Sequence, residues 1–525
     1  MCRKNYHSIT IHADGDGSTI LDHPLHDEGC NPHPQDHLVP PFSSQQDEES
    51  ATTNSSDRPS SLLVGAFNLI ATILGGGVLT LPIAFQKCGI AVTTIFMLIS
   101  AFMTYMSLIM LAYSSRRSGA SSFGEVVRSA YGAKAEVGVN LILFVYCSFV
   151  VAAFMVLIRD IWTPLVGMFL GKTDNEVSGD RVLVGFMIFL LPFLFQRSLH
   201  ALKWNCYIGF ASIIILCTAL VRGGFERQHN IHLGGTDQQD DDGTYNIEWF
   251  KVPSIQDALF AFPIIMLAFL CQFNVLSIQN TLQRPTRRRM SQVIGMSVGT
   301  SMILMYLFGL GGYMMYGSNI QGNVLLNISV DKSAYADESL YWMFFLGRIG
   351  SGMTIALALP LSFLPGRDAL LEIIGGWFNV NDTRKDYVNA AKHEIDEMEI
   401  QTLCGDDGFA TRTTTTSIRD QPIRIQRDFF RNSIFHYGST LLIVTYCFIG
   451  ATRVAGVATI WSLVGSSLAF FIAFILPFAS FIVIEKNVTD GNDRFDGWIK
   501  LAKVMLAVSI VGAVVCTWNR LSSTV

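Results

Sequence analysis

The stretch Phe67–Pro82 reads FNLIATILGGGVLTLP and lies inside an apolar run, Leu62 to Gln86, that contains no charged residue. A helix needs about 20 apolar residues to cross a bilayer, so the run is long enough. Three successive glycines, Gly75–Gly77, lie in its middle. Each glycine costs a helix interior about 1 kcal/mol relative to alanine. The stretch therefore predicts a helix that opens partway across the membrane.

An opened helix exposes backbone N–H and C=O groups, which are tolerated at membrane depth only where they line a protected cavity. We therefore expect a binding site in the first span. Its candidate residues are Asn68, Thr72, Gly75, Gly76 and Gly77. The alternative interpretation is a close contact between helices, because glycine also lets two backbones approach each other.

The composition is that of a polytopic membrane protein. The chain has 525 residues, of which 50% are hydrophobic and only 15% charged, and its net charge of −5 sits in tails and loops. Its ten cysteines are scattered, and their spacing indicates neither a disulfide framework nor a zinc site. No cleavable signal peptide is expected, because the first 60 residues are polar throughout.

Residues 1–60 are predicted to form a disordered cytoplasmic tail, because they are rich in Asp, Glu, Ser, Pro and His and lack apolar periodicity. The segment from His33 to His37 suggests a metal site. Pro34 and the nearby Pro40 and Pro41 argue against the helix that would aim both rings at one ion. We interpret the segment as a solvated polar tail without a metal.

The membrane-spanning part of the chain is predicted over 61–520. We expect an all-α protein with eleven membrane spans. The fourth span is short, so its ends are the least defined. The predicted spans are 62–86, 89–113, 136–158, 181–196, 204–221, 255–280, 291–316, 340–364, 433–450, 457–484 and 498–518.

The distribution of Lys and Arg predicts a cytoplasmic N-terminus and an outer C-terminus. The 365–432 loop, with nine basic residues from Arg367 to Arg431, is then a large cytoplasmic segment. The 222–254 loop has three basic residues against six acidic ones and lies outside. Asn327 begins an outer Asn-Ile-Ser sequence and is the glycosylation candidate.

The sixth span contains a second informative stretch, 261–290, which reads AFPIIMLAFLCQFNVLSIQNTLQRPTRRRM. Pro263 weakens its helix, and uncharged polar side chains at this depth must face protein or water. Three of them, Gln272, Asn274 and Ser277, are further substrate-binding candidates. The alternative is polar contact between helices.

The two interrupted spans are five apart, which is the pattern of an inverted-repeat transporter. The expected fold is therefore two inverted five-helix repeats, with broken helices 1 and 6 and an eleventh helix appended. In that arrangement the opened helix ends supply N–H groups to a substrate carboxylate.

These residues also carry a family resemblance. FNLIATILGGGVLTLP resembles the first-span signature of the amino acid/auxin permease family, and CQFNVLSIQNTLQRPTRRRM resembles its sixth-span signature. The similarity is greatest to the branch of sodium-coupled neutral and vacuolar amino acid transporters. ALPLSFLPGRDAL (358–370) and GSSLAFFIAFILPFASFIVI (465–484) resemble the end of its eighth span and its tenth. The resemblance implies ion-coupled or gradient-driven movement of amino acids.

The chain departs from the family pattern at positions that bear on the coupling ion. Mammalian members commonly have a histidine where Gln272 stands and an acidic residue where Asn274 stands. Sodium-coupled members have an asparagine at the position of Ala71 and a threonine near Ala356 or Ala358. We therefore expect H⁺ rather than Na⁺ as the coupling ion, with no other cofactor.

Sodium remains the alternative, because hydroxyls one turn away could replace the missing ligands. These ion-coupling candidates are Thr72, Ser351 and Thr354. The substrate is expected to be a neutral amino acid. Asp257, Glu338 and Glu485 stand at span ends, where we interpret them as solvated caps, and a buried unpaired cation is costly.

Arg348 stands about 8 residues, or roughly 12 Å, into the eighth span. A charge there needs a partner or water. We predict a gating role in which Arg348 pairs with Asp257. The alternative is a side chain that snorkels to the outer surface.

Other functions fit the sequence less well than transport does. An enzyme is disfavoured because the spans lack paired carboxylates or histidine clusters, and a metal carrier because they lack carboxylate or imidazole ligands. An amino acid sensor on the same fold stays open, with the tail or the 365–432 loop contacting a regulatory partner. We expect an integral protein of the plasma membrane or of a vacuolar or lysosomal membrane, with no nucleic acid partner.

Overall fold

In the computed structural model the chain divides into two units, Met1–Thr53 and Asn54–Val525. The predicted disordered tail lies outside the described residues, as do the last 29 residues, 404–432, of the large loop. The structure describes residues 61–171, 177–195, 203–232, 247, 249–250, 253–283, 286–403, 433–454, 456–488 and 496–522.

The first span is interrupted where the sequence predicts. Helix α2 (Leu62–Ile73) begins after Ser61, whose hydroxyl caps it by accepting from the Val64 N–H. Leu74 leaves the helical conformation, Gly75 is extended, and a short 3₁₀ helix, η1 (Gly76–Thr80), follows. The chain then continues directly into α3 (Leu81–Ser118).

Helix α3 contains the end of the first span and all of the second. Its backbone turns at Gly89, whose φ of 71° lies in the left-handed region that favours glycine. The boundary predicted between 86 and 89 therefore lies at a residue that can reverse the chain direction.

The sixth span is interrupted in the same way. Helix α8 (Ile255–Ala268) ends at Ala268, and α9 (Gln272–Thr281) begins after the three residues Phe269, Leu270 and Cys271. Pro263 lies inside α8, so the break is downstream of the proline that the sequence indicates as a weak point.

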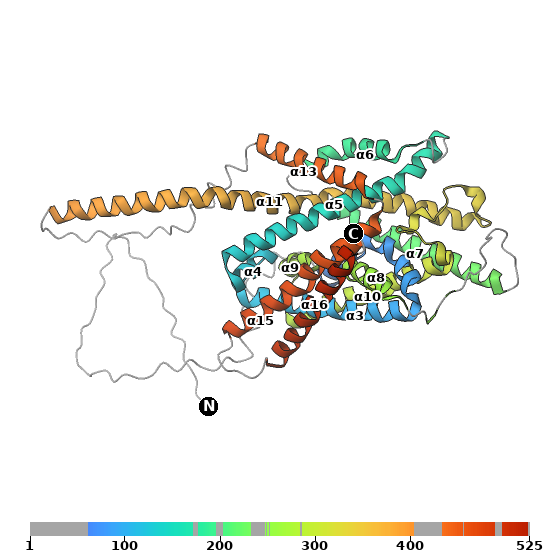
Figure 1. Ribbon diagram of the computed structural model, residues 1–525, viewed down its shortest axis with the longest axis horizontal. Coiled ribbons are helices and arrows are strands. Elements are labelled where there is room, and N and C mark those ends of the chain that lie inside the picture. The colour runs from blue at the N-terminus through green and yellow to red at the C-terminus, as the bar shows by residue number, and fades with distance from the viewer. Residues whose placement is uncertain are drawn as a thin grey trace, which may run out of the picture. The chain divides into compact units, whose positions relative to one another are not determined.

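The remaining predicted spans all coincide with helices (Figure 1). Eight helical segments of the described chain are long and apolar enough to cross a membrane, whereas α2 has 12 residues and α6 has 16. The number of eleven crossings therefore stays a prediction.

Helix α7 extends to His232, well beyond the predicted end at 221. These helices are α5 (Ala133–Leu170), α6 (Gly179–Leu194), α7 (Lys203–His232), α10 (Arg287–Tyr316), α11 (Glu338–Leu403), α13 (Ser433–Arg453), α14 (Val457–Val464), α15 (Leu476–Val488) and α16 (Asp496–Ser522); a short amphipathic helix, α4 (Phe123–Tyr131), precedes α5.

The tenth span is also irregular. Two single-turn π-helical segments, Gly465–Ala469 and Phe471–Ile475, lie between α14 and α15. Hydroxyls from neighbouring helices bond to carbonyls in this region: Ser107 donates to Ala473 and Thr517 donates to Ser466. Such donors satisfy backbone groups that a regular helix would satisfy internally.

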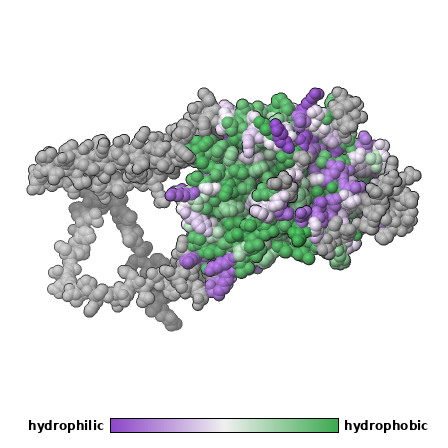
Figure 2. Space-filling model, viewed as in Figure 1, coloured by the Kyte–Doolittle hydropathy of each residue, from purple (hydrophilic) through white to green (hydrophobic). Residues whose placement is uncertain are grey.

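Small residues bring the helices close together. A Cβ on Gly350 would lie 2.0 Å from the Ser212 hydroxyl, and one on Gly465 would lie 2.4 Å from the Pro263 carbonyl oxygen. The first pair joins α11 to α7 and the second joins the tenth span to α8. Figure 2 shows the result, a broad apolar surface between two more polar ends. This is the surface expected of a helix bundle in lipid.

Candidate functional site

The glycine triplet combines an opened backbone with close packing. Gly75 is exposed and extended, and a 3₁₀ helix that begins at Gly76 leaves the N–H groups at its start without acceptors inside that helix. A Cβ on Gly76 would lie 3.0 Å from both Phe154 and Leu157 of α5. The two interpretations of the triplet therefore apply to different residues: Gly75 opens the helix, and Gly76 permits a close contact.

The structure brings the two interrupted spans together. The side-chain amide of Asn274, in the first turn of α9, donates to the Thr72 hydroxyl at 3.2 Å. Thr72 in turn donates to the Asn68 carbonyl at 2.9 Å, near the end of α2. A Cβ on Gly77 would lie 3.5 Å from Ala268, the last residue of α8. Both halves of both broken helices thus meet around one point.

Gln272 is the most deeply buried of the polar candidates, at 0% exposure. Its Oε1 accepts from the Cys271 N–H at 3.0 Å, whereas its Nε2 has no hydrogen-bond partner. A buried donor without an acceptor is costly, so this amide is suited to a ligand oxygen. Ser277, further along α9, is exposed.

Two aromatic residues near the triplet were missed by sequence reasoning. Phe154 of α5 packs edge-to-face on Trp461 of α14 with 6.3 Å between ring centroids, and both are buried. The Trp461 indole N–H and the adjacent Ser462 hydroxyl have no hydrogen-bond partner. Nothing local in an apolar span distinguishes these residues from lipid-facing ones, so only the packing identifies them.

The three ion-coupling candidates do not share one set of contacts. Thr354 donates to the Gly350 carbonyl at 2.8 Å, and its own carbonyl accepts from Asn205 of α7 at 3.3 Å. Its methyl group lies 2.6 Å from the position of a Gly209 Cβ, so it packs against α7. Ser351 is buried with a hydroxyl that lacks a partner. Thr72 contacts α9 instead.

Arg348 is buried, with 2% of the residue exposed, so the snorkelling interpretation is wrong. Its guanidinium donates to the Leu325 carbonyl. Leu325 belongs to a short helix, η4 (Val324–Leu326), that contacts η1 and α5. Burial raises the pKa of Tyr335, in the same outer loop, to about 12, and the charge of Arg348 acts in the opposite direction. Arg348 therefore anchors the loop that covers the opened first span.

Asp257 takes part in an ion pair at the start of α8. Its carboxylate lies 3.1 Å from Lys87 Nζ and accepts from the Ser254 hydroxyl at 2.7 Å. The Arg348–Asp257 ion pair stays a prediction. Both Asp257 and Lys87 are partly exposed, so this pair holds the outer end of α8 near the end of the first span.

The side chain of Asn327 is engaged within the outer loop. Its Nδ2 donates to the Asn319 carbonyl at 2.7 Å, and its Oδ1 accepts from the Gln321 N–H at 2.9 Å. A glycan attaches at Nδ2, so the first of these bonds would have to open for modification. Glycosylation of Asn327 stays a prediction.

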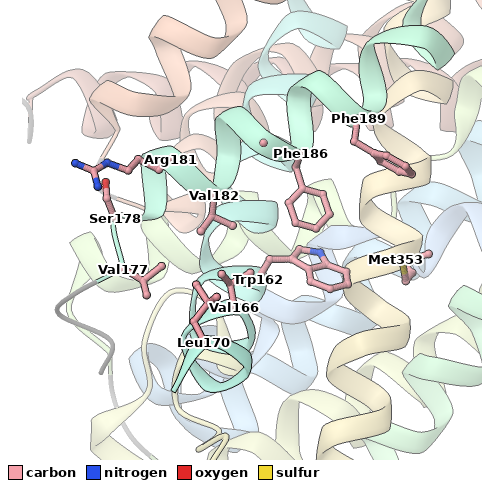
Figure 3. A pocket seen from close by; sticks show the side chains of 11 residues that line it. Trp162, Val166, Leu170, Val177, Ser178, Arg181, Val182, Phe186, Phe189 and Met353 are labelled. Atoms are coloured by element: carbon pink, nitrogen blue, oxygen red, sulfur yellow. The ribbon is translucent and has the colours of Figure 1, made fainter. Parts of the chain in front are cut away.

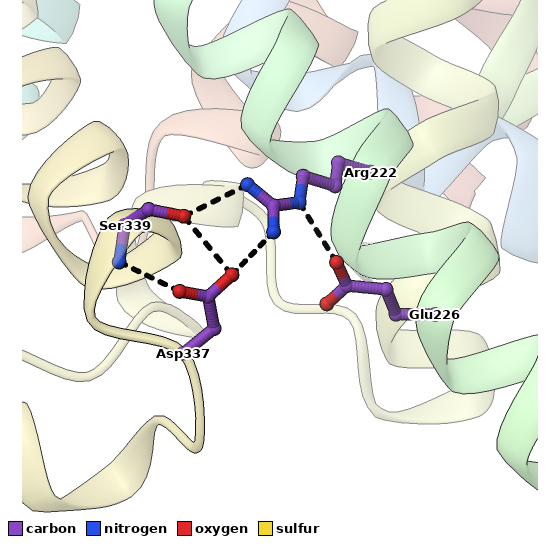
Figure 4. Close-up of polar contacts among 4 residues, drawn as sticks. All are labelled: Arg222, Glu226, Asp337 and Ser339. Atoms are coloured by element: carbon purple, nitrogen blue, oxygen red, sulfur yellow. Dashed lines mark hydrogen bonds and ion pairs between the residues drawn. The ribbon is translucent and has the colours of Figure 1, made fainter.

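An ion network joins α7 to the start of α11 (Figure 4). Arg222 donates to Glu226 at 2.8 Å, to the Ser339 hydroxyl at 2.8 Å and to Asp337. Hydrogen bonds from the backbone and side chain of Ser339, together with the charge of Arg222, lower the pKa of Asp337.

The opposite end of the bundle has its own polar contacts. Arg117 at the end of α3 lies 3.4 Å from Glu485 of α15, and Gln279 of α9 donates to the Ser115 hydroxyl at 3.3 Å. Glu485 is 0% exposed, so its interpretation as a solvated cap is wrong. The end of α15 that contains Glu485 is buried because α3 and α15 pack together.

Two cavities lie away from the residues described above. One of about 670 Å³ lies between α5, α6 and α11, and its apolar wall includes Trp162, Phe186 and Met353 (Figure 3). The other, of about 280 Å³, lies between α3, α10, α15 and α16. The substrate candidates line neither cavity.

Comparison with known proteins identifies relatives of this chain. The family model for transmembrane amino acid transporter proteins matches residues 58–520. Vacuolar amino acid transporter 7 of Saccharomyces cerevisiae is 26% identical over 318 residues, 60% of this chain and 60% of the relative. Putative sodium-coupled neutral amino acid transporter 11 of Danio rerio is 24% identical over 59% of this chain and 65% of the relative. These matches therefore span less than two thirds of either relative.

A third relative matches over more of its length. Vacuolar amino acid transporter 5 of S. cerevisiae is 23% identical over 85% of this chain and 94% of the relative. Among solved structures, Mhp1, a nucleobase-cation-symport-1 family transporter in a closed conformation with bromovinylhydantoin bound, superimposes with a TM-score of 0.50. That match covers 90% of this chain and 94% of Mhp1 at 10% identity, so it concerns the fold alone.

Proposed function

Since this chain belongs to the transmembrane amino acid transporter family, we propose that it is a secondary active transporter of neutral amino acids coupled to protons. The observation that carries the proposal is the meeting of the two interrupted spans, through Asn274 and Thr72, beside the exposed Gly75. Opened helices at membrane depth serve a ligand, because their backbone groups need partners.

The substrate's carboxylate is assigned to the N-terminal end of η1. The N–H groups there carry the positive end of the helix dipole, which favours an anion. Gln272 is the second polar group, because its Nε2 lacks a partner in the described structure. Phe154 and Trp461 supply apolar surface beside the glycines for a side chain.

A neutral side chain is favoured by the charges. The buried charged residues of the described chain are Arg348, Arg367 and Glu485. Arg348 and Arg367 donate to the Leu325 and Leu194 carbonyls, and Glu485 pairs with Arg117. A lysine or arginine side chain would enter this site without a carboxylate to pair with, at a cost of several kcal/mol.

Proton coupling is favoured by the lack of side-chain oxygen ligands at Ala71, Ala356 and Ala358. The hydroxyl of Thr354 bonds to its own helix and its methyl group packs on α7, which weakens it as a replacement. Sodium coupling is the second candidate, supported by the sodium-coupled transporter that the Danio rerio relative is named as. The names of the yeast relatives support a vacuolar or lysosomal membrane, with the plasma membrane as the alternative.

Uptake by proteoliposomes that contain the full chain tests the proposal, with pH and Na⁺ gradients imposed separately. We expect uptake of neutral amino acids to increase when the donor side is acidified without Na⁺. Uptake that requires Na⁺ and ignores pH would contradict proton coupling, and preference for lysine or arginine would contradict the neutral substrate. Binding without uptake under every gradient would favour the sensor.

A further inference from the structure

The smaller cavity opens at the end of the bundle where the basic loops lie. It is formed by the end of α3, the start of α10, the end of α15 and the start of α16, and its volume is about 280 Å³. It is separate from the glycine triplet and from the contact between Thr72 and Asn274. The positive-inside distribution of Lys and Arg places this end at the cytoplasmic surface.

Two arginines line the cavity, Arg116 from α3 and Arg287 from α10, and both are exposed. The guanidinium of Arg287 lies over the Tyr113 ring, 4.7 Å from its centroid, and donates to the Tyr113 hydroxyl at 3.3 Å. A guanidinium has five N–H donors, so this contact fixes its position and leaves donors for an anion. The neighbouring Arg117 lies 3.4 Å from Glu485, and its guanidinium is 5.7 Å from the Tyr113 ring centroid.

The rest of the lining is apolar. Ile109 and Met110 of α3, Met290 of α10 and Phe481 of α15 form the wall, and Met290 and Phe481 are almost fully buried. Trp498, in the first turn of α16, is 43% exposed at the rim, where indole rings sit at membrane interfaces. One cavity thus joins two cations at the membrane surface to an apolar wall that runs toward the bilayer interior.

We propose that this cavity binds an anionic phospholipid of the cytoplasmic leaflet. Its phosphate lies between Arg116 and Arg287, and one acyl chain follows the wall at Ile109 and Phe481. Basic pockets between membrane helices on this side match the headgroups of anionic lipids, which are concentrated in that leaflet. A bound lipid bridges α3 and α10 to α15 and α16, so its occupancy stabilises the bundle.

The test measures phospholipid retained by the purified full chain after exchange into nanodiscs of phosphatidylcholine and phosphatidylserine, read by native mass spectrometry. The wild type should retain phosphatidylserine in preference to phosphatidylcholine. The double variant Arg116→Gln/Arg287→Gln should lose about 25-fold of that preference, because each basic residue near an anionic surface contributes about fivefold. Arg288→Gln is the matched control, since it removes an exposed charge from the same turn of α10 but does not line the cavity.

A second variant separates the cavity from the general field of the basic surface. Ile109→Trp fills the apolar part and leaves every charge in place, so it should also reduce phosphatidylserine retention. Equal retention of both lipids by the wild type, or an equal loss in Arg288→Gln, would overturn the proposal. Displacement of the bound lipid by millimolar inorganic phosphate would also overturn it, because the site would then recognise phosphate without the acyl chain.

Discussion

Asn274 donates a 3.2 Å hydrogen bond to Thr72, a residue 202 positions earlier in the chain. The bond joins the first turn of α9 to the last turn of α2, on either side of the two helix interruptions. It therefore couples the position of one broken span to that of the other, and any ligand at the opened ends lies beside it.

Removal of the Thr72 hydroxyl should weaken transport. In Thr72→Val the Asn274 amide loses this acceptor, at a cost of about 1 kcal/mol or roughly fivefold in apparent affinity. Uptake as a function of amino acid concentration measures this change in apparent affinity. Thr218→Val is the control, because Thr218 also donates to a carbonyl of its own helix but is exposed on α7. Equal kinetics in both variants would show that the bond is only structural.

The glycine triplet should tolerate side chains unequally. A Cβ on Gly75 would meet only the Thr72 carbonyl oxygen, at an ordinary 3.6 Å, whereas one on Gly76 would press on Phe154 and Leu157 at 3.0 Å. Gly76→Val should therefore abolish uptake and destabilise the protein by about 1–3 kcal/mol, while Gly75→Ala keeps the fold. Gly138→Val, at an open position of α5, is the control. Normal uptake by Gly76→Val would contradict the close contact.

The two partners of the Arg117–Glu485 ion pair should respond differently to neutralisation. Glu485 is fully buried, whereas the side chain of Arg117 is 34% exposed. Arg117→Gln should cost about 2 kcal/mol or more, because it weakens the pairing of a buried carboxylate, and Glu485→Gln should cost less, because Arg117 can reach water. Thermal unfolding of the purified proteins measures both, and a larger cost for Glu485→Gln would contradict this account.

Arg348 should be required as an arginine. Its planar guanidinium reaches the Leu325 carbonyl from a buried position, which the smaller ammonium of lysine does not reproduce. Arg348→Lys should reduce uptake at least tenfold with membrane abundance retained. Arg181→Lys, an exposed arginine of α6, is the control. Full transport by Arg348→Ala would rule out the anchoring of the outer loop.

The contacts of Asp337 in the network around Arg222 should still stabilise the folded protein in moderate acid. Because the pKa of Asp337 is lowered in the folded state, its stabilisation is present above the unfolded value of about 3.9 and is lost as the pH falls through the lower folded value. The difference in Tm between wild type and Asp337→Asn should persist at pH 5 and disappear only well below pH 4. Asp331→Asn controls for loss of a loop carboxylate, and a difference that vanishes by pH 5 would contradict the prediction.

The sequence by itself determined where the helices open. Gly75–Gly77 and the polar residues after Leu270 act on their own backbone, so their effect is visible in an apolar run whatever packs around it. The same local patterns carry the family resemblance, and the match to the family model over residues 58–520 confirmed it. Local composition also predicted the apolar helices, but it did not predict α4 or the extensions of α7 and α11 beyond their predicted spans.

Only the tertiary structure decided which side chains meet. In it Asn274 donates a hydrogen bond to Thr72, and the Thr354 methyl group packs against α7. Asp257 forms an ion pair with Lys87, and Glu485 is buried. These contacts join segments up to 368 residues apart in the chain. Each depends on how two helices cross and on the small residues that let them approach, and a helix's own sequence does not encode the identity of the neighbour that covers it.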